Sequence, residues 1–263
     1  MALSNTPIYL STFLLEGNRS NGRGPSLLVS DWMEPIAEAG FRGVEIWAPH
    51  LLFASRSEWE AIREKSQESD IPVVFLYAQL TTDASDRSRR QRESLMEASG
   101  YFGVQGVKFT LSEGATIEEQ VSFLSEWGRD LPRDVQLVRA FEGRTPQSGE
   151  IAACRKKLGG RFRCSLNPFS LGIEKVGELF KGGDGDVIVN LGVRISSGGK
   201  NEGLRDAEEA CNEVVSMMQR FDFKGSWTLE STTGVGAPGE DIEDLFDESE
   251  EDLNFLVTAL TRR

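Results

Sequence analysis

The sequence predicts a single-domain α/β protein, a (β/α)8 or TIM barrel that spans residues 1–263. Short apolar or β-branched segments alternate with amphipathic helical segments, and the alternation repeats eight times at intervals of about 25–40 residues. Repeated βα units favour a parallel sheet with right-handed crossovers. A chain of 263 residues also suits the roughly 250 residues that eight such units usually need.

The expected strands are short runs rich in Val, Ile, Leu and Phe, a composition that suits strands buried on both faces of a parallel sheet. In chain order they are Ile8–Phe13, Val44–Trp47, Val73–Tyr77, Gly106–Thr110, Val135–Phe141, Arg163–Leu166, Val187–Leu191 and Ser226–Glu230. A doubly wound open sheet is the alternative. No GxGxxG motif follows the first strand, however, and the chain has no GxxxxGK[ST] motif.

Each expected strand is followed by a segment whose apolar residues recur at helical spacing. These helices are Leu27–Ala39, Ser57–Ser69, Asp86–Phe102, Thr116–Leu131, Gln147–Leu158, Ile173–Phe180, Asp206–Arg220 and Glu248–Thr261. The acidic segment Glu240–Asp252 is interpreted as the solvated start of the last helix, where carboxylates interact favourably with the helix dipole.

Composition argues against several functional classes. The net charge of −13 argues against nucleic acid as a partner, because a duplex-binding protein needs a basic surface. No apolar run approaches the length of a membrane span, and the N-terminal segment lacks the basic region of a signal peptide. The three cysteines, Cys154, Cys164 and Cys211, lack metal-site spacing; we expect free thiols, which suits a cytoplasmic protein.

Polar residues end the last four expected strands, where a barrel of this kind carries its catalytic groups. They are Glu142, Asn167, Asn190 and Glu230, with Arg144 and Arg194 just beyond the fifth and seventh strands. Strand alternation places each of the four on a side that could face the barrel interior. We therefore expect these side chains to converge at one end of the barrel.

The chain resembles the xylose isomerase-like barrels, a superfamily of sugar isomerases, epimerases and inosose dehydratases. The resemblance is carried by "GFRGVEIWAPHL" in the second strand and by "RRQRESLMEASGYFGVQGVKF" before and within the fourth. It continues with "FEGRTP", "SLNPF" and "WTLES" at the fifth, sixth and eighth strand ends. These motifs keep the order and spacing of that superfamily over nearly the whole chain.

The resemblance implies a divalent metal held by Glu, Asp, His and Glu from strands five to eight. Carried over by position, these ligands are Glu142, Asn167, Asn190 and Glu230, so that Asn replaces Asp and His. Ser170 also stands where the resemblance implies a supporting His. Amide oxygens suit hard cations but carry no charge, and the lost imidazole removes a preference for transition metals. The resemblance thus implies Mg²⁺ or Mn²⁺, whereas the departures predict weak occupancy, and we expect no other cofactor.

Without a metal, converging carboxylates repel each other unless a proton or a cation intervenes. Arg144 and Arg194 are the cations that we expect to replace the metal charge and to bind substrate; the alternative is that both point to solvent. 

Four further residues are candidate substrate-binding groups: Glu45, Trp47, His50 and Lys108. Glu45 and Trp47 share one side of the second strand. Three of them also have a structural interpretation: a polar group filling the barrel for Glu45, a loop cap for His50 and an ordinary surface or ion-paired lysine for Lys108.

Two functions from different classes fit these observations. The first is a sugar isomerase or epimerase that removes a proton next to a carbonyl through an enediolate, with Glu142 and Glu230 as the acid–base pair. The second is an inactive barrel that binds a small polar ligand or a protein partner. A zinc-dependent AP endonuclease is excluded by the single histidine and the negative charge. We expect a small sugar-like substrate, and the oligomeric state stays open, a homo-oligomer included.

Overall fold

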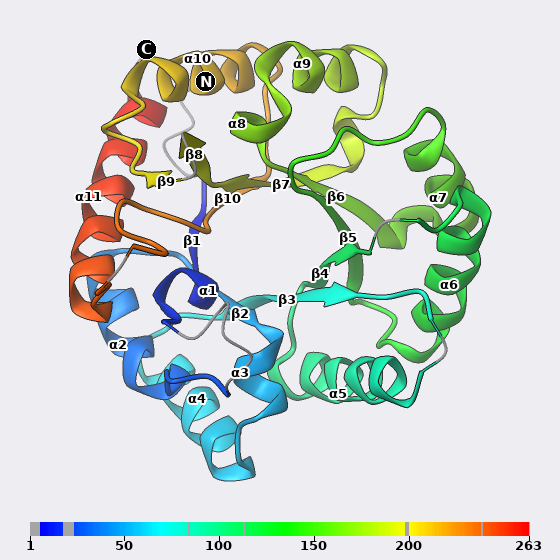
Figure 1. Ribbon diagram of the computed structural model, residues 1–263, viewed down its shortest axis with the longest axis horizontal. Coiled ribbons are helices and arrows are strands. Elements are labelled where there is room, and N and C mark those ends of the chain that lie inside the picture. The colour runs from blue at the N-terminus through cyan, green and yellow to red at the C-terminus, as the bar shows by residue number, and fades with distance from the viewer. Residues whose placement is uncertain are drawn as a thin grey trace.

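The computed structural model describes residues 6–17, 24–83, 85–112, 114–197, 200–237 and 239–262. Eight parallel strands close a barrel in the order β1-β10-β7-β6-β5-β4-β3-β2. Figure 1 looks into the barrel, with the helices forming a ring around it. The predicted (β/α)8 fold is confirmed.

The barrel strands lie close to the predicted ranges: β1 Ile8–Ser11, β2 Val44–Trp47, β3 Val73–Leu80, β4 Gly106–Leu111, β5 Gln136–Phe141, β6 Phe162–Leu166, β7 Ile188–Val193 and β10 Ser226–Leu229. The first strand is shorter than predicted, because the chain enters the short helix α1, Thr12–Leu15, directly after Ser11. A small antiparallel hairpin, β8 Ile195–Ser197 with β9 Lys200–Glu202, follows β7.

The outer helices are α2 Val29–Ala39, α4 Arg56–Glu68, α5 Asp86–Phe102, α6 Ile117–Asp130, α7 Glu150–Leu158, α9 Ile173–Lys181, α10 Glu208–Arg220 and α11 Ile242–Thr261. Shorter elements lie in the connections: α3 Ala48–Leu52, α8 Pro168–Leu171, η1 Gly159–Arg161 and η2 Gly185–Val187. Helix α11 begins earlier than predicted because the Asp241 side chain accepts a hydrogen bond from the backbone N–H of Glu243 and caps the helix.

The main apolar core lies between the barrel strands and the outer helices, and it includes all three cysteines as free, buried thiols. The interior of the barrel carries polar side chains as well, among them Ser165, Asn190 and Thr228, all buried. Among the described residues, no helix is both long and apolar enough to cross a membrane.

Candidate active site

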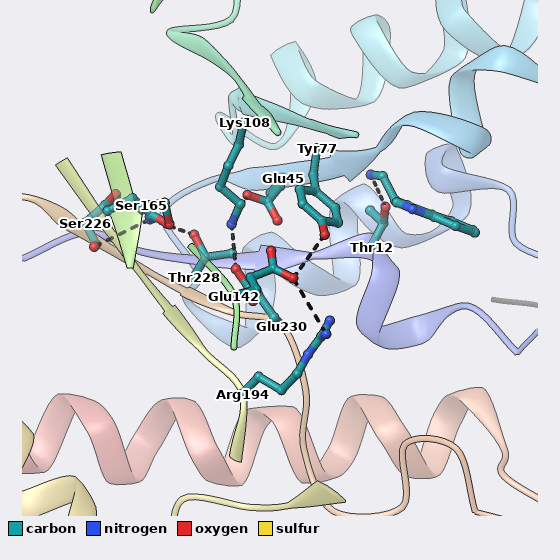
Figure 2. Close-up of polar contacts among 12 residues, drawn as sticks. Thr12, Glu45, Tyr77, Lys108, Glu142, Ser165, Arg194, Ser226, Thr228 and Glu230 are labelled. Atoms are coloured by element: carbon teal, nitrogen blue, oxygen red, sulfur yellow. Dashed lines mark hydrogen bonds and ion pairs between the residues drawn. The ribbon is translucent and has the colours of Figure 1, made fainter. Parts of the chain in front are cut away.

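A buried ion-pair cluster lies in the barrel at the carboxyl ends of its strands. The Nζ atom of Lys108 on β4 lies 2.6 Å from Oε2 of Glu45 on β2 and 2.6 Å from Oε1 of Glu230, directly after β10. The side chains of Lys108 and Glu45 are fully buried, and that of Glu230 is 5% exposed. Figure 2 shows the lysine directed at Glu230 with Glu45 beside it.

A second group lies next to this cluster and is more open to solvent. Glu142, directly after β5, accepts a hydrogen bond of 3.1 Å from the hydroxyl of Tyr77 on β3. The Nη1 atom of Arg194 lies 3.8 Å from the same Oε2 atom of Glu142, and these two side chains are 30% and 17% exposed. Tyr77 and Arg194 therefore approach Glu142 from different strands, as Figure 2 shows.

The electrostatics of this arrangement favour a proton on Glu142. Burial and the charge of Glu230 raise the pKa of Glu142 to about 7, although Arg194 and Lys108 act in the opposite direction. Burial alone would lower the pKa of Lys108, but the nearby glutamates raise it above its ordinary value, so this side chain stays an ammonium. Burial and Glu142 raise the pKa of Tyr77, which therefore stays a hydrogen-bond donor.

Several carboxylate oxygens at this site have no hydrogen-bond donor. Both oxygens of Glu45, Oε1 of Glu142 and Oε2 of Glu230 are buried, and none accepts a hydrogen bond from the residues that the structure describes. Glu45 Oε2 contacts the Lys108 ammonium as an ion pair, whereas Glu142 Oε1 and Glu230 Oε2 belong to the two residues that directly follow their strands. Buried polar atoms are nearly always satisfied in proteins, so an unpaired pair at a barrel mouth indicates a place for a polar partner.

Aromatic side chains lie beside Glu142 and Arg194. The Phe13 ring contacts those of Trp47 and Tyr77 edge-on, at centroid distances of 5.4 and 6.5 Å. The guanidinium of Arg194 lies over Phe13, 4.9 Å from the ring centroid. Sequence reasoning identified Trp47 but missed Phe13, because this residue was placed at the end of the first strand rather than in α1.

Asn167 is positioned as a helix cap. Its Oδ1 atom accepts hydrogen bonds from the backbone N–H groups of Phe169 and Ser170 at 3.0 and 3.2 Å, at the start of α8. Its Nδ2 atom donates to the backbone carbonyl of Arg194 at 2.9 Å. Ser170 completes the turn by donating to the Asn167 carbonyl and accepting from the N–H of Gly143. Both polar atoms of the Asn167 side chain are thus engaged.

Asn190 does not join the strand-end glutamates as predicted, because it lies deeper in the barrel. In the register of β7 and β10 it pairs with Ser226. Its amide accepts from Ser165 at 2.8 Å and donates to Ser226 and Thr228 at 2.9 and 2.8 Å. The expectation that four strand ends converge is therefore wrong for Asn190.

The residue of β7 beside Glu230 is Gly192. A Cβ atom at this position would lie 2.4 Å from Glu230 Oε1, so the carboxylate fills the space that any side chain would need. Sequence reasoning selected the polar Asn190 and missed Gly192, because a glycine has no side chain that would indicate a functional site.

Arg144 does not lean over the strand-end glutamates as expected. Its guanidinium forms two hydrogen bonds with the buried Glu150 carboxylate, of 2.9 and 2.7 Å, at the start of α7. Arg144 lies three residues after the end of β5, so the course of the loop decides its direction. Of the two arginines proposed to replace the metal charge, only Arg194 lies at the carboxylates.

His50 is buried between α1 and α3 and belongs to a structural contact. Its ring nitrogens lie 2.7 Å from the hydroxyl of Thr12 and 2.8 Å from Oε2 of Glu16. These bonds tie the loops after β1 and β2 together, which matches the loop-capping alternative for His50.

The described residues do not fit the divalent metal that the resemblance implies. Asn167 is engaged in capping, Asn190 lies deeper, and the residue beside Glu230 is glycine. An ammonium already contacts Glu230. In the described part of the chain, no three His, Cys, Asp or Glu side chains are arranged to hold a metal ion.

Comparisons with known proteins place the fold. No protein-family model and no curated protein sequence matches the chain. Its structure resembles a D-psicose 3-epimerase from Clostridium cellulolyticum H10 solved with D-tagatose, with a TM-score of 0.71 and 14% identity over 97% of this chain and 100% of that one. It also resembles a xylose isomerase domain protein from Alicyclobacillus acidocaldarius, with a TM-score of 0.66 and 14% identity over 98% of this chain and 99% of that one. A third match is a probable 3-DHS dehydratase from Bacillus anthracis, with a TM-score of 0.62 and 12% identity over 98% of this chain and 99% of that one. These structural matches confirm the (β/α)8 barrel fold predicted from the sequence.

Proposed function

We propose that the chain is a sugar isomerase or epimerase that moves a proton at a carbon next to a carbonyl group in a small polyhydroxylated compound. The observation that carries the proposal is the pair of buried, unpartnered carboxylate oxygens on Glu142 and Glu230. Structures with this fold include proteins named as epimerases of D-psicose and of a 3-keto-D-glucoside, which supports a sugar-like substrate.

The two glutamates have different surroundings, which suits different roles. The ammonium of Lys108 compensates the charge of Glu230, which acts as the carboxylate that removes the proton. Glu142, with its pKa raised to about 7, carries a proton for part of the time at neutral pH and acts as the acid. Tyr77 holds Glu142 in position through its hydroxyl.

In the proposed reaction the C–H bond next to the carbonyl breaks and its proton goes to Glu230. The electron pair moves into the carbon–carbon bond, and the carbonyl oxygen either takes the proton of Glu142 or stays an anion that the guanidinium of Arg194 stabilises. Return of a proton to the former carbonyl carbon, with loss of the proton of the adjacent enediol hydroxyl, gives an isomer. Return of a proton to the original carbon from the opposite face gives an epimer. Loss of a hydroxyl group after the same first step would give a dehydratase.

The mouth offers both contacts that a sugar needs. Phe13, Trp47 and Tyr77 present ring surfaces to the apolar face of a sugar, and Arg194 and the two glutamates present polar groups to its hydroxyls.

Hydrogen exchange tests the proposal directly. The protein is incubated in D₂O with a panel of ketoses, aldoses and keto-polyols, and loss of the C–H signal next to the carbonyl is followed by NMR. We expect exchange with at least one compound, reduced by 100-fold or more in Glu142→Gln and Glu230→Gln, in line with the usual contribution of a general acid or base of about 10²–10⁴-fold.

The exposed Glu38→Gln on α2 is the matched control and should exchange like the unmodified protein. Binding of a panel compound without exchange would contradict the proposal and favour the inactive barrel.

A further inference from the structure

With all its carboxylates ionised, the site has the same net charge as the metal site that the resemblance implies, but Lys108 and Arg194 supply the positive charge. The resemblance implies three carboxylates around one divalent cation. The structure places three carboxylates, those of Glu45, Glu142 and Glu230, around the single positive charges of Lys108 and Arg194. When Glu142 is ionised, both sets sum to one negative charge, although the third carboxylate now comes from β2 instead of β6.

Lys108 reaches across the barrel from β4 toward β10, which is four strands away in the closed order. It reaches Glu45 on β2 and Glu230 after β10 with equal N–O distances of 2.6 Å, which are short charge-assisted contacts. The Tyr77 ring, 5.4 Å from Nζ, adds a further favourable contact for a cation. The ammonium is completely buried, so the protein itself encloses this charge.

Glycine at position 192 allows this arrangement. Because residue 192 has no Cβ atom, the Glu230 carboxylate can lie against the backbone of β7 while it contacts Lys108. Any side chain on β7 at this level would collide with the carboxylate. The small residue and the lysine are therefore two parts of one arrangement.

From these contacts we propose that Lys108 is a built-in replacement for the divalent cation: it positions Glu230 and makes the site independent of metal. This inference rests on the proposed function for the role of Glu230, but the claim about metal is independent of turnover. Lys108 is a positioning residue, since its contacts are to Glu45 and Glu230 and not to the reacting carbon.

The first experiment measures metal in the unmodified protein. Elemental analysis should find well under one equivalent of Mn, Co or Zn. Excess Mn²⁺ should leave the melting temperature unchanged, and EDTA should leave any hydrogen exchange unchanged. One equivalent of bound metal, or exchange that EDTA abolishes, would overturn the inference.

The second experiment removes the ammonium. Lys108→Ala leaves two buried carboxylates facing a space that a metal ion can enter, so Co²⁺ should give a visible absorption band and Mn²⁺ should raise the melting temperature. A rise of about 5 °C or more is expected at saturating metal. Lys108→Met, which removes the charge but fills the space, and Lys108→Ala/Glu45→Gln, which removes one ligand, should gain much less.

The outcomes separate the two proposals. A Co²⁺ band in the unmodified protein, or equal Mn²⁺ responses in the Ala and Met variants, would refute the role of Lys108 whatever the exchange assay shows. If Lys108→Ala does not fold, Lys108→Met/Glu45→Gln removes one charge of each sign, and its failure to impair exchange would equally refute the positioning role. Absence of exchange in the unmodified protein would refute only the proposed function.

Discussion

The pH dependence of stability offers a quantitative test of the environment of Glu142. Burial and the charge of Glu230 raise its pKa from the ordinary 4.5 to about 7 in the folded protein. Between these two values the folded state binds more protons than the unfolded state, so the unfolding free energy falls as the pH rises. Since a tenfold change in proton affinity corresponds to about 1.4 kcal/mol, Glu142 should remove about 3 kcal/mol between pH 4.5 and pH 8.

Glu142→Gln should abolish this contribution, because glutamine does not titrate and keeps nearly the same shape. Urea unfolding of both proteins at about pH 5 and about pH 8 gives the difference, with other titrating groups such as Asp252 cancelling in the comparison. The unfolding free energy of the variant, relative to that of the unmodified protein, should therefore be higher at pH 8 than at pH 5. The exposed Glu38→Gln should follow the unmodified protein. Parallel pH curves for Glu142→Gln and the unmodified protein would refute the reasoning.

Two further substitutions test how the site is built. Asn167→Ala removes the cap of α8 and the hydrogen bond to the Arg194 carbonyl. Urea unfolding should show that the unfolding free energy falls by about 1 kcal/mol. The exchange assay should show a raised KM, because Arg194 is less well placed. Gly192→Ala introduces a Cβ atom 2.4 Å from Glu230 Oε1; exchange should fall by about 10-fold or more through kcat, and an unchanged kcat would contradict the packing of Glu230 against this glycine.

The fold was predictable from the sequence because eight βα units leave few alternatives. Parallel strands bring their carboxyl ends to one side of the barrel, so polar residues at strand ends converge without any knowledge of the loops. This reasoning is sufficient for Glu142 and Glu230, which follow β5 and β10 directly. For Glu45 and Lys108 it is not sufficient: the sequence marks both as candidates, but it favours an ordinary surface or ion-paired lysine at position 108 and does not show that the two side chains contact each other.

The remaining features depend on geometry that a single sequence does not contain. Strand alternation gives no direction for a residue three positions into a loop, and Arg144 accordingly pairs with the nearby Glu150 instead of Glu142. A polar residue in an apolar strand can stand at the end of the strand or in a polar layer inside the barrel. Asn190 belongs to such a layer, because β7 continues to Val193 and Asn190 pairs with Ser226 at the start of β10.

The hydrogen bonds of residue 167 favour asparagine over aspartate. The side chain must accept from two N–H groups of α8 and donate to the carbonyl of Arg194. An amide can do both, whereas an ionised aspartate has no hydrogen to donate. Aspartate would also bring another negative charge to the end of the barrel where Glu142 and Glu230 lie. Asparagine instead holds the backbone of Arg194, whose guanidinium lies beside Glu142. Restoring aspartate here would thus weaken the placement of one cation without removing Lys108, the other. Changing Asn190 to histidine would place an imidazole one layer too deep, among Ser165, Ser226 and Thr228.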